Sequence, residues 1–158
     1  MKILLVIDLQ KQYQNNKQYK KCLEFIRNNK DYFIVAVNTL SNKTLNLNND
    51  TSYSELDFYY NEYFSKVSYS ICNLHFIQAY EKWLKLAKII DNISKPKLEF
   101  YIIGCETSAS ILATAFSLWD RKENFKILSD YVYSSTDNKK EYTQLLNTIR
   151  KNFKDCIV

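Results

Sequence analysis

The sequence predicts a three-layer α/β protein of the Rossmann-like kind, with a mostly parallel sheet between two layers of helices. Its apolar runs of strand length are continuous rather than alternating, which is typical of strands buried on both faces of a parallel sheet. Segments with helical periodicity separate these runs, and this alternation favours a doubly wound sheet. We expect the strand order 3-2-1-4-5. A length of 158 residues, without an internal repeat or a linker, predicts one domain over 1–158.

The first half of the chain contains two expected strands, "ILLVI" at 3–7 and "YFIVAVNTL" at 32–40. An amphipathic helix is expected between them over 11–29, where apolar side chains recur among Lys, Gln and Asn. Residues 41–57 are rich in Asn, Ser and Thr and are expected to form a loop. The aromatic segment 58–70 is ambiguous and has room for a short strand.

The second half begins with the most convincing helical pattern, over 73–92, and Pro96 follows its end. Apolar side chains recur at helical spacing within it, namely Leu74, Ile77, Trp83, Leu84, Leu86, Ala87 and Ile90. The remaining segments alternate between the two kinds of structure: a strand at 98–104, a helix at 108–121, a strand at 125–128 and a helix at 138–153. The final "CIV" is expected to add an edge strand.

The charge of the chain argues against a nucleic-acid-binding protein. The net charge is +5 and the sequence pI about 8.9, but the lysines are scattered. The densest basic run, "KQYKK" at 17–21, lies on a helix whose other face is apolar, and we interpret it as a solvated face. A mild positive potential would favour an anionic small ligand.

Cysteine and histidine usage argues against a zinc site and predicts no cofactor. The four cysteines form no CxxC pair, and His75 is the single histidine, which we expect to be structural. The apolar run after Met1 has five residues and ends at Asp8, which is too short for a signal peptide or a membrane span. We therefore expect a cytoplasmic protein with reduced thiols and no membrane partner.

Three polar residues follow expected strands, where ligands of open parallel sheets collect. Asp8 ends the first strand, Lys66 lies before the long helix, and Ser110 begins the helix after the strand 98–104. Each has a simpler structural explanation: a turn cap, a solvated lysine, and a hydroxyl that satisfies helical N–H groups. Taken together, they would provide a proton acceptor, an electrostatic partner and a nucleophile beside a helix N-terminus. Gly104, the one glycine of the chain, would allow close backbone approach there.

The sequence resembles the isochorismatase-like hydrolases, the superfamily of the nicotinamidases and other cysteine hydrolases. The resemblance rests on four segments that occur in the family's order: "LLVIDLQKQY" (4–13), "KVSYS" (66–70), "YIIGCETSASILATAFSLWDR" (101–121) and "ILSDYVYSS" (127–135). It implies a Rossmann-like sheet and an Asp–Lys–Cys triad in which the cysteine attacks an amide or related carbon. In this chain it assigns Asp8 as general base, Lys66 as charge partner and position 110 as nucleophile.

The resemblance also implies a set of substrate-binding residues. The family tends to have a non-proline cis peptide at the junction, which would be Cys105–Glu106, and backbone N–H groups around Glu106 and Ser110 would form the oxyanion hole. Tyr13 matches an aromatic residue of the family's pocket, and Tyr69 is a second candidate for its lining. Ordinary packing explains the two tyrosines equally simply, because the chain has 13 of them.

Two departures from the family pattern bear on activity. Position 110 is serine instead of cysteine, and a serine hydroxyl cannot ionise beside a lysine as a thiol does. We therefore expect the chain to be weak or inactive as an amide hydrolase. Cys105 is a poor substitute nucleophile, because it lies five residues earlier. The nicotinamidase metal-binding pattern would fall on "NTLSNKTLNLNND", which contains no histidine.

Three interpretations are open. In the first, Ser110 is an engineered replacement for the cysteine of an amide hydrolase that cleaves C–N bonds. In the second, the serine is natural and the protein is a pseudoenzyme that binds a small molecule, with an anionic or nucleotide-derived compound as a candidate. In the third, Asp8 acts as an acid on a vinyl ether, as in true isochorismatases. We also expect a homo-oligomer, with segment 41–64 shaping the pocket or a subunit contact.

Overall fold

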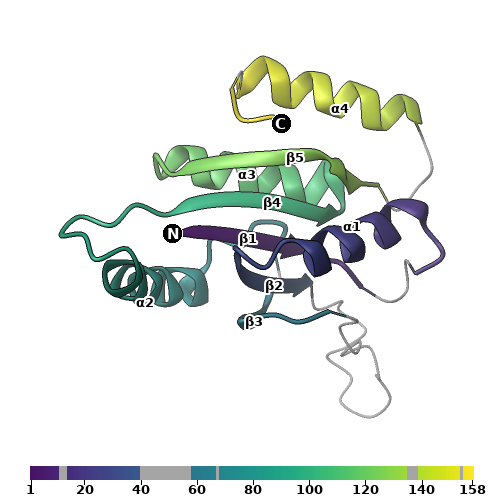
Figure 1. Ribbon diagram of the computed structural model, residues 1–158. Helices are drawn as coiled ribbons and strands as arrows, with labels where there is room; N and C mark the ends of the chain where they lie inside the picture. Colours follow the sequence, from purple (N-terminus) through teal and green to yellow (C-terminus); the bar gives the residue numbers. More distant parts are fainter. Residues whose placement is uncertain (11–13, 40–57, 67, 135–138, 154) are drawn as a thin grey trace, which may run out of the picture.

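A five-stranded sheet forms the centre of the computed structural model (Figure 1). The structure describes residues 1–10, 14–39, 58–66, 68–134, 139–153 and 155–158. The strands follow the order β3-β2-β1-β4-β5, and each neighbouring pair is parallel. Their bounds are β1 Lys2–Ile7, β2 Phe33–Thr39, β3 Glu62–Lys66, β4 Glu99–Cys105 and β5 Asn124–Tyr133. The expected strand order and parallel sheet are thereby confirmed.

Helices cover both faces of this sheet, so the expected three layers are also confirmed (Figure 1). Helix α1 (Lys17–Asn28) packs on one face against Leu4, Val6 and their neighbours. The other face carries α2 (Leu74–Ile90), α3 (Leu112–Asp120) and α4 (Lys139–Asn152), which share one apolar cluster with Ile3, Leu5 and Ile7. Residues 3–7 are fully buried because alternate side chains of β1 point into the two clusters, which explains the continuous apolar run.

Two strands differ in length from the sequence-based expectation. The ambiguous segment 58–70 contains β3, which pairs with β2 and ends at Lys66. Strand β5 continues to Tyr133, beyond the expected 125–128. Its register against β4 shifts between Ile102 and Gly104, and pairing then resumes at Gly104–Val132. Polar residues at this irregularity interrupt the apolar run of β5, so the sequence pattern predicted too short a strand. The expected loop 41–57 lies outside the described residues.

The apolar spacing identified only part of the face that helix α2 buries. Its buried stripe is Phe76, Ala79, Trp83 and Ala87, of which Trp83 and Ala87 were expected, while Leu74, Ile77 and Ile90 are exposed. His75, which was expected to be structural, is exposed. The reason is that consecutive helical residues diverge by about 100°, and the sheet covers one narrow stripe of the helix.

The C-terminal residues pair with β5, as expected for "CIV". Ile157 forms a parallel bridge with Ile127, supported by hydrogen bonds from the Ile127 N–H to the Cys156 carbonyl and from the Val158 N–H to the Ile127 carbonyl. The final residues thereby extend the sheet at its β5 edge.

Gly104 lies where β4 approaches β1 most closely. It pairs with Ile7 and has a φ of +117°, a conformation that residues with a side chain rarely adopt. A Cβ atom built on it would lie 1.9 Å from the carbonyl oxygen of Ile7. The chain therefore needs glycine at this position for two reasons, backbone conformation and space.

We predict that Gly104→Ala lowers the free energy of unfolding by more than about 3 kcal/mol, because the clash involves backbone rather than a flexible side chain. Urea unfolding followed by circular dichroism measures this loss. Ser108→Ala, at an exposed position of the same segment, serves as the control and should change stability by less than about 0.5 kcal/mol. Equal unfolding midpoints for Gly104→Ala and the unmodified chain would contradict the prediction.

Candidate active site

Asp8 turns its carboxylate toward the end of β2. It follows β1 directly and has a φ of +49°, a left-handed conformation that Asp tolerates better than most residues. Its N–H donates to the Val37 carbonyl at 2.8 Å. The Thr39 N–H donates to Oδ1 of Asp8, and the Thr39 hydroxyl lies 3.0 Å from Oδ2. These contacts fix the carboxylate at the carboxyl end of the sheet.

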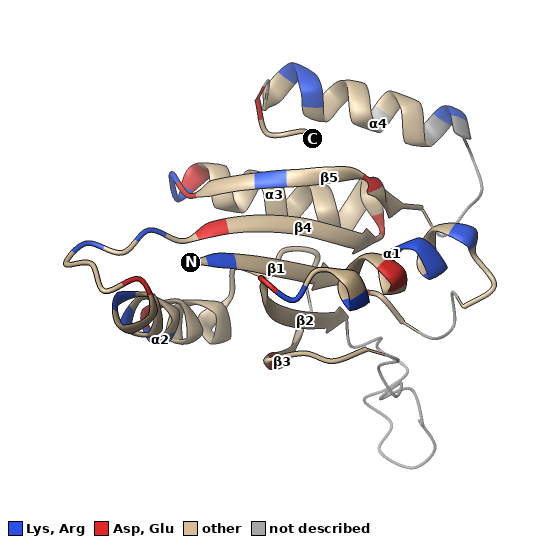
Figure 2. Cartoon of the chain, viewed as in Figure 1, with Lys and Arg blue, Asp and Glu red and all other residues tan. Residues whose placement is uncertain are grey.

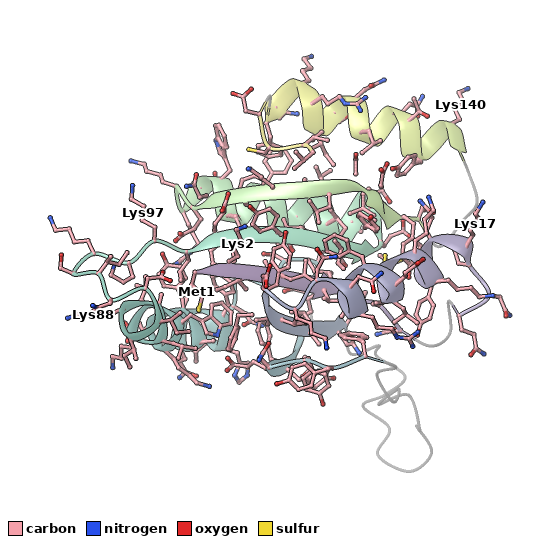
Figure 3. The ribbon with its side chains drawn as sticks, viewed as in Figure 1. Met1, Lys2, Lys17, Lys88, Lys97 and Lys140 are labelled. Carbon is pink, nitrogen blue, oxygen red and sulfur yellow. The ribbon has the colours of Figure 1, made fainter. Side chains whose placement is uncertain are left out.

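Lys66, the last residue of β3, is buried, with 1% of its surface exposed. It contrasts with Lys17, Lys88, Lys97 and Lys140, which extend from separate places on the surface (Figure 3). Its Nζ lies 3.0 Å from Oδ2 of Asp8 and 3.0 Å from Oγ of Ser110, and 3.2 Å from the Ser68 carbonyl oxygen. It also bonds to Oγ1 of Thr39. Lys66 is thus the point at which the other polar groups meet.

Ser110 lies in a π-helical turn, Thr107–Ile111, that precedes α3. The N–H groups of Ala109 and Ile111 both donate to the Glu106 carbonyl, at 3.2 and 3.1 Å, which widens this turn. Single π-helical turns occur frequently at functional sites. Ser110 is 3% exposed, and its hydroxyl oxygen lies 3.0 Å from Nζ of Lys66.

The junction between β4 and the π-helical turn has the geometry that the resemblance implies, because the Cys105–Glu106 peptide bond is cis. Two serine hydroxyls hold the side chain of Glu106. Its Oε1 accepts hydrogen bonds from the hydroxyls of Ser134, at 2.6 Å, and Ser108, at 3.3 Å. The hydrogen bond from Ser134 connects the junction to the end of β5.

The directions of the hydrogen bonds follow from the groups involved. A lysine ammonium has only donors and a carboxylate has only acceptors. Lys66 therefore donates to Asp8, Thr39 and Ser110, and Ser110 accepts with its oxygen. Chemically, the site presents a buried N–H donor to whatever atom stands at position 110, which favours an electron-rich or anionic atom there.

The structure thus brings Asp8, Lys66 and Ser110 together, and their catalytic roles stay a prediction. Cys105 is fully buried at the end of β4. Tyr69 is 68% exposed, so its role in lining a pocket also stays a prediction. Tyr13 lies outside the described residues.

Thr39 is the site residue that the sequence analysis missed. Part of its signal is in the sequence, because it is a polar residue near the end of the strand expected at 32–40. Its register pairing with Lys66 is a feature of the tertiary structure alone.

Charge elsewhere is spread out, with Lys and Arg residues on α1, α4, several loops and β5 rather than on one stripe (Figure 2). Among the described residues, there is no group of three or more His, Cys, Asp or Glu side chains placed to hold a metal ion. The stretch where the nicotinamidase metal pattern would fall lies mostly outside those residues. A helix long and apolar enough to cross a membrane is also absent from the described part of the chain.

This chain resembles known proteins in its structure. The sequence matches no protein-family model and no curated protein. Solved structures do match, each over 99% of this chain: an isochorismatase-like hydrolase from Alkaliphilus metalliredigens (17% identity, TM-score 0.68, 93% of that chain), a nicotinamidase from Staphylococcus aureus (16%, 0.69, 96%) and a pyrazinamidase from Pyrococcus horikoshii in complex with zinc (19%, 0.65, 96%). The chain therefore has the isochorismatase-like hydrolase fold.

Cys22, on α1, is a buried thiol close to this junction. Its Sγ lies 3.1 Å from the Tyr131 carbonyl oxygen, to which it donates. Burial raises the pKa of the Cys22 thiol to about 12, and the nearby Gly104 backbone opposes this in part. The thiol therefore stays protonated and is a structural group beside the β4–β5 irregularity.

We predict that Lys66→Met destabilises the fold by about 3–5 kcal/mol, because it leaves the Asp8 carboxylate without its buried partner. Urea unfolding measures the loss. Lys82→Met is a matched control, since the Lys82–Glu62 pair is 3.2 Å apart but Lys82 is 68% exposed, and its loss should cost less than about 1 kcal/mol. Combining Lys66→Met with Asp8→Asn should recover part of the stability; no recovery would argue against a coupled pair.

A second prediction concerns alkaline pH. The native Cys22 thiol has a pKa of about 12, against an ordinary value of 9.0, so above pH 9 the unfolded chain releases a proton that the native chain keeps. Its contribution to stability is complete below pH 9 and is lost as the pH rises toward 12. Urea midpoints measured from pH 7 to 10.5 should fall less steeply for Cys22→Ala than for the unmodified chain. Parallel curves would contradict this assignment.

Proposed function

We propose that this chain has the site of a small-molecule hydrolase that cleaves an amide C–N bond through the side chain at position 110. The observation that carries the proposal is the position of the Lys66 Nζ, 3.0 Å from both the Asp8 carboxylate and the Ser110 hydroxyl, at the carboxyl ends of parallel strands. Lys66 contacts both the carboxylate and the nucleophile position and gives each a hydrogen bond. The fold supports a hydrolase by analogy only, whereas the side chains of the site are the basis for the proposed reaction.

In the proposed reaction, the side-chain atom of residue 110 forms a bond to the amide carbonyl carbon. The proton of that side chain passes to the Asp8 carboxylate and then to the leaving nitrogen as the C–N bond breaks. Water next forms a bond to the same carbon, its proton passes to Asp8, and the bond to residue 110 breaks as that side chain recovers a proton. The sum is amide plus water to carboxylic acid plus amine.

Serine is poorly suited to this site. Ser110 accepts its hydrogen bond from Lys66, and a charged lysine cannot accept the serine proton in return. Serine nucleophiles normally depend on a hydrogen-bonded base, usually histidine. A cysteine at this position gives up its proton to Asp8 more readily, because the Lys66 ammonium and the helix N-terminus both stabilise the thiolate that forms. We therefore expect weak activity with serine and restored activity with cysteine.

A ligand-binding protein without turnover is the second candidate function, and Ser110 itself favours it. The same buried donor at Lys66 that would stabilise a thiolate can hold a polar or anionic group of a small molecule. An anionic or nucleotide-derived ligand, a cytoplasmic location and a homo-oligomeric state stay predictions of the sequence.

The test compares the chain as it stands with Ser110→Cys. Both are incubated with small amides, nicotinamide-like compounds and nucleotide-derived compounds, and mass spectrometry records products and retained ligand. We expect Ser110→Cys to raise turnover at least about 100-fold, and Asp8→Asn in that background to lower it by about 100-fold or more.

The outcomes separate the two candidates. Turnover that appears with cysteine and disappears with Asp8→Asn supports the hydrolase. An unmodified ligand that both chains retain, without turnover in either, supports the binding protein and contradicts the hydrolase. Turnover in Ser110→Cys that survives Asp8→Asn would contradict the role of Asp8.

A further inference from the structure

We infer that Thr39 is a positioning residue of this site, one that orients the Asp8 carboxylate and shares the N–H donors of Lys66 with position 110. The inference rests on the proposed function for its consequence in catalysis. Its structural basis is independent, because it concerns contacts that exist without substrate.

All the polar groups of Thr39 take part in the site. Its N–H donates to Oδ1 of Asp8 and its hydroxyl contacts Oδ2 at 3.0 Å, so the two oxygens of one carboxylate are held by one residue. Its carbonyl oxygen accepts from Nε2 of Gln10 at 3.3 Å, which fastens the turn after β1 to the end of β2. Its hydroxyl oxygen also contacts Lys66. The hydroxyl thus has two partners, Asp8 and Lys66, which its one hydrogen and two lone pairs allow.

The direction of each bond in this group is fixed by chemistry. Lys66 can only donate, so the Thr39 oxygen accepts from it, and the Thr39 hydrogen is then available for Asp8, which can only accept. The result is a closed triangle: Lys66 donates to Thr39 and to Asp8, and Thr39 donates to Asp8. The Thr39 hydroxyl therefore holds Oδ2 of Asp8, the same oxygen that Lys66 contacts, and the Thr39 N–H holds Oδ1.

Lys66 has more acceptors than hydrogens. Its ammonium carries three N–H bonds, while four oxygens lie within hydrogen-bonding distance: those of Asp8, Thr39, Ser68 and Ser110. At any moment one of these oxygens lacks a hydrogen from Lys66. Thr39 therefore competes with residue 110 for the N–H groups of Lys66. This competition affects the strength of the hydrogen bond between Lys66 and the nucleophile position.

The measurement that tests Thr39 does not need turnover. Carbon-13 NMR of the Asp8 carboxyl, assigned by comparison with Asp8→Asn, reports the hydrogen bonds that its oxygens accept at one fixed pH. Among the described residues, Lys66 is the charged group in contact with Asp8, and every variant keeps it. We expect Thr39→Val, which keeps the N–H and the shape but removes the hydroxyl, to change the carboxyl chemical shift of Asp8.

Two comparisons make the result specific to the hydroxyl. Thr39→Ser should give the Asp8 carboxyl shift of the unmodified chain, and Thr148→Val, which removes a hydroxyl that bonds to the Gln144 carbonyl on α4, should leave that shift unchanged. If Thr39→Val does not fold, Thr39→Ala removes the same hydroxyl with less steric demand. A carboxyl shift that stays the same without the hydroxyl would overturn the inference, and so would an equal change in Thr39→Ser.

Catalysis provides the second readout. In the Ser110→Cys background, Thr39→Val should lower kcat by about 10-fold or more with little change in KM, because the hydroxyl contacts the Asp8 carboxylate, and Thr39→Ser should restore kcat. If Ser110→Cys has no turnover, the proposed function fails while the carboxyl chemical shift still decides the role of Thr39. If turnover exists and kcat is unchanged in Thr39→Val, the positioning role is wrong although the hydrolase proposal stands.

Discussion

A lysine ammonium buried beside a carboxylate is the interaction on which the rest of this structure depends. Removing Lys66 from water is costly unless its N–H bonds find acceptors and its charge finds a partner. The acceptors come from the ends of β1 and β2, from Ser68 just after β3, and from the turn before α3. Four segments that are far apart in the sequence therefore have to end at one place, and the parallel sheet supplies that place.

The close approach of β4 to β1 is the backbone counterpart of that interaction. The π-helical turn with Ser110 begins three residues after Gly104. Asp8 directly follows Ile7, which is the register partner of Gly104. A larger residue at 104 would push these two strand ends apart through the Ile7 carbonyl. This is why a chain that makes all its other turns without glycine keeps one at this junction.

The fold leaves open which chemistry the protein performs. The structures that resemble it include proteins described as nicotinamidase, pyrazinamidase and MAR1 ribonuclease, each less than 20% identical to this chain. Function therefore depends on the side chains, and here above all on the atom at position 110. A donor such as Lys66 is well placed to stabilise a thiolate at position 110, whereas a serine oxygen in the same place accepts the hydrogen bond and keeps its own proton.

The sequence by itself determined the layers, the strand order and the segments that carry Asp8, Lys66 and Ser110, because continuous apolar runs and helical periodicity are local patterns. It did not determine which stripe of α2 is buried, how far β5 extends, or that Thr39 belongs to the site. Those features depend on contacts between segments that are distant in the chain: the sheet selects the stripe, the β4–β5 register shift lets pairing resume, and the β2–β3 register sets Thr39 beside Lys66. Only the tertiary structure decided them, since hydrogen bonds across parallel strands leave no periodic trace in the sequence of either strand.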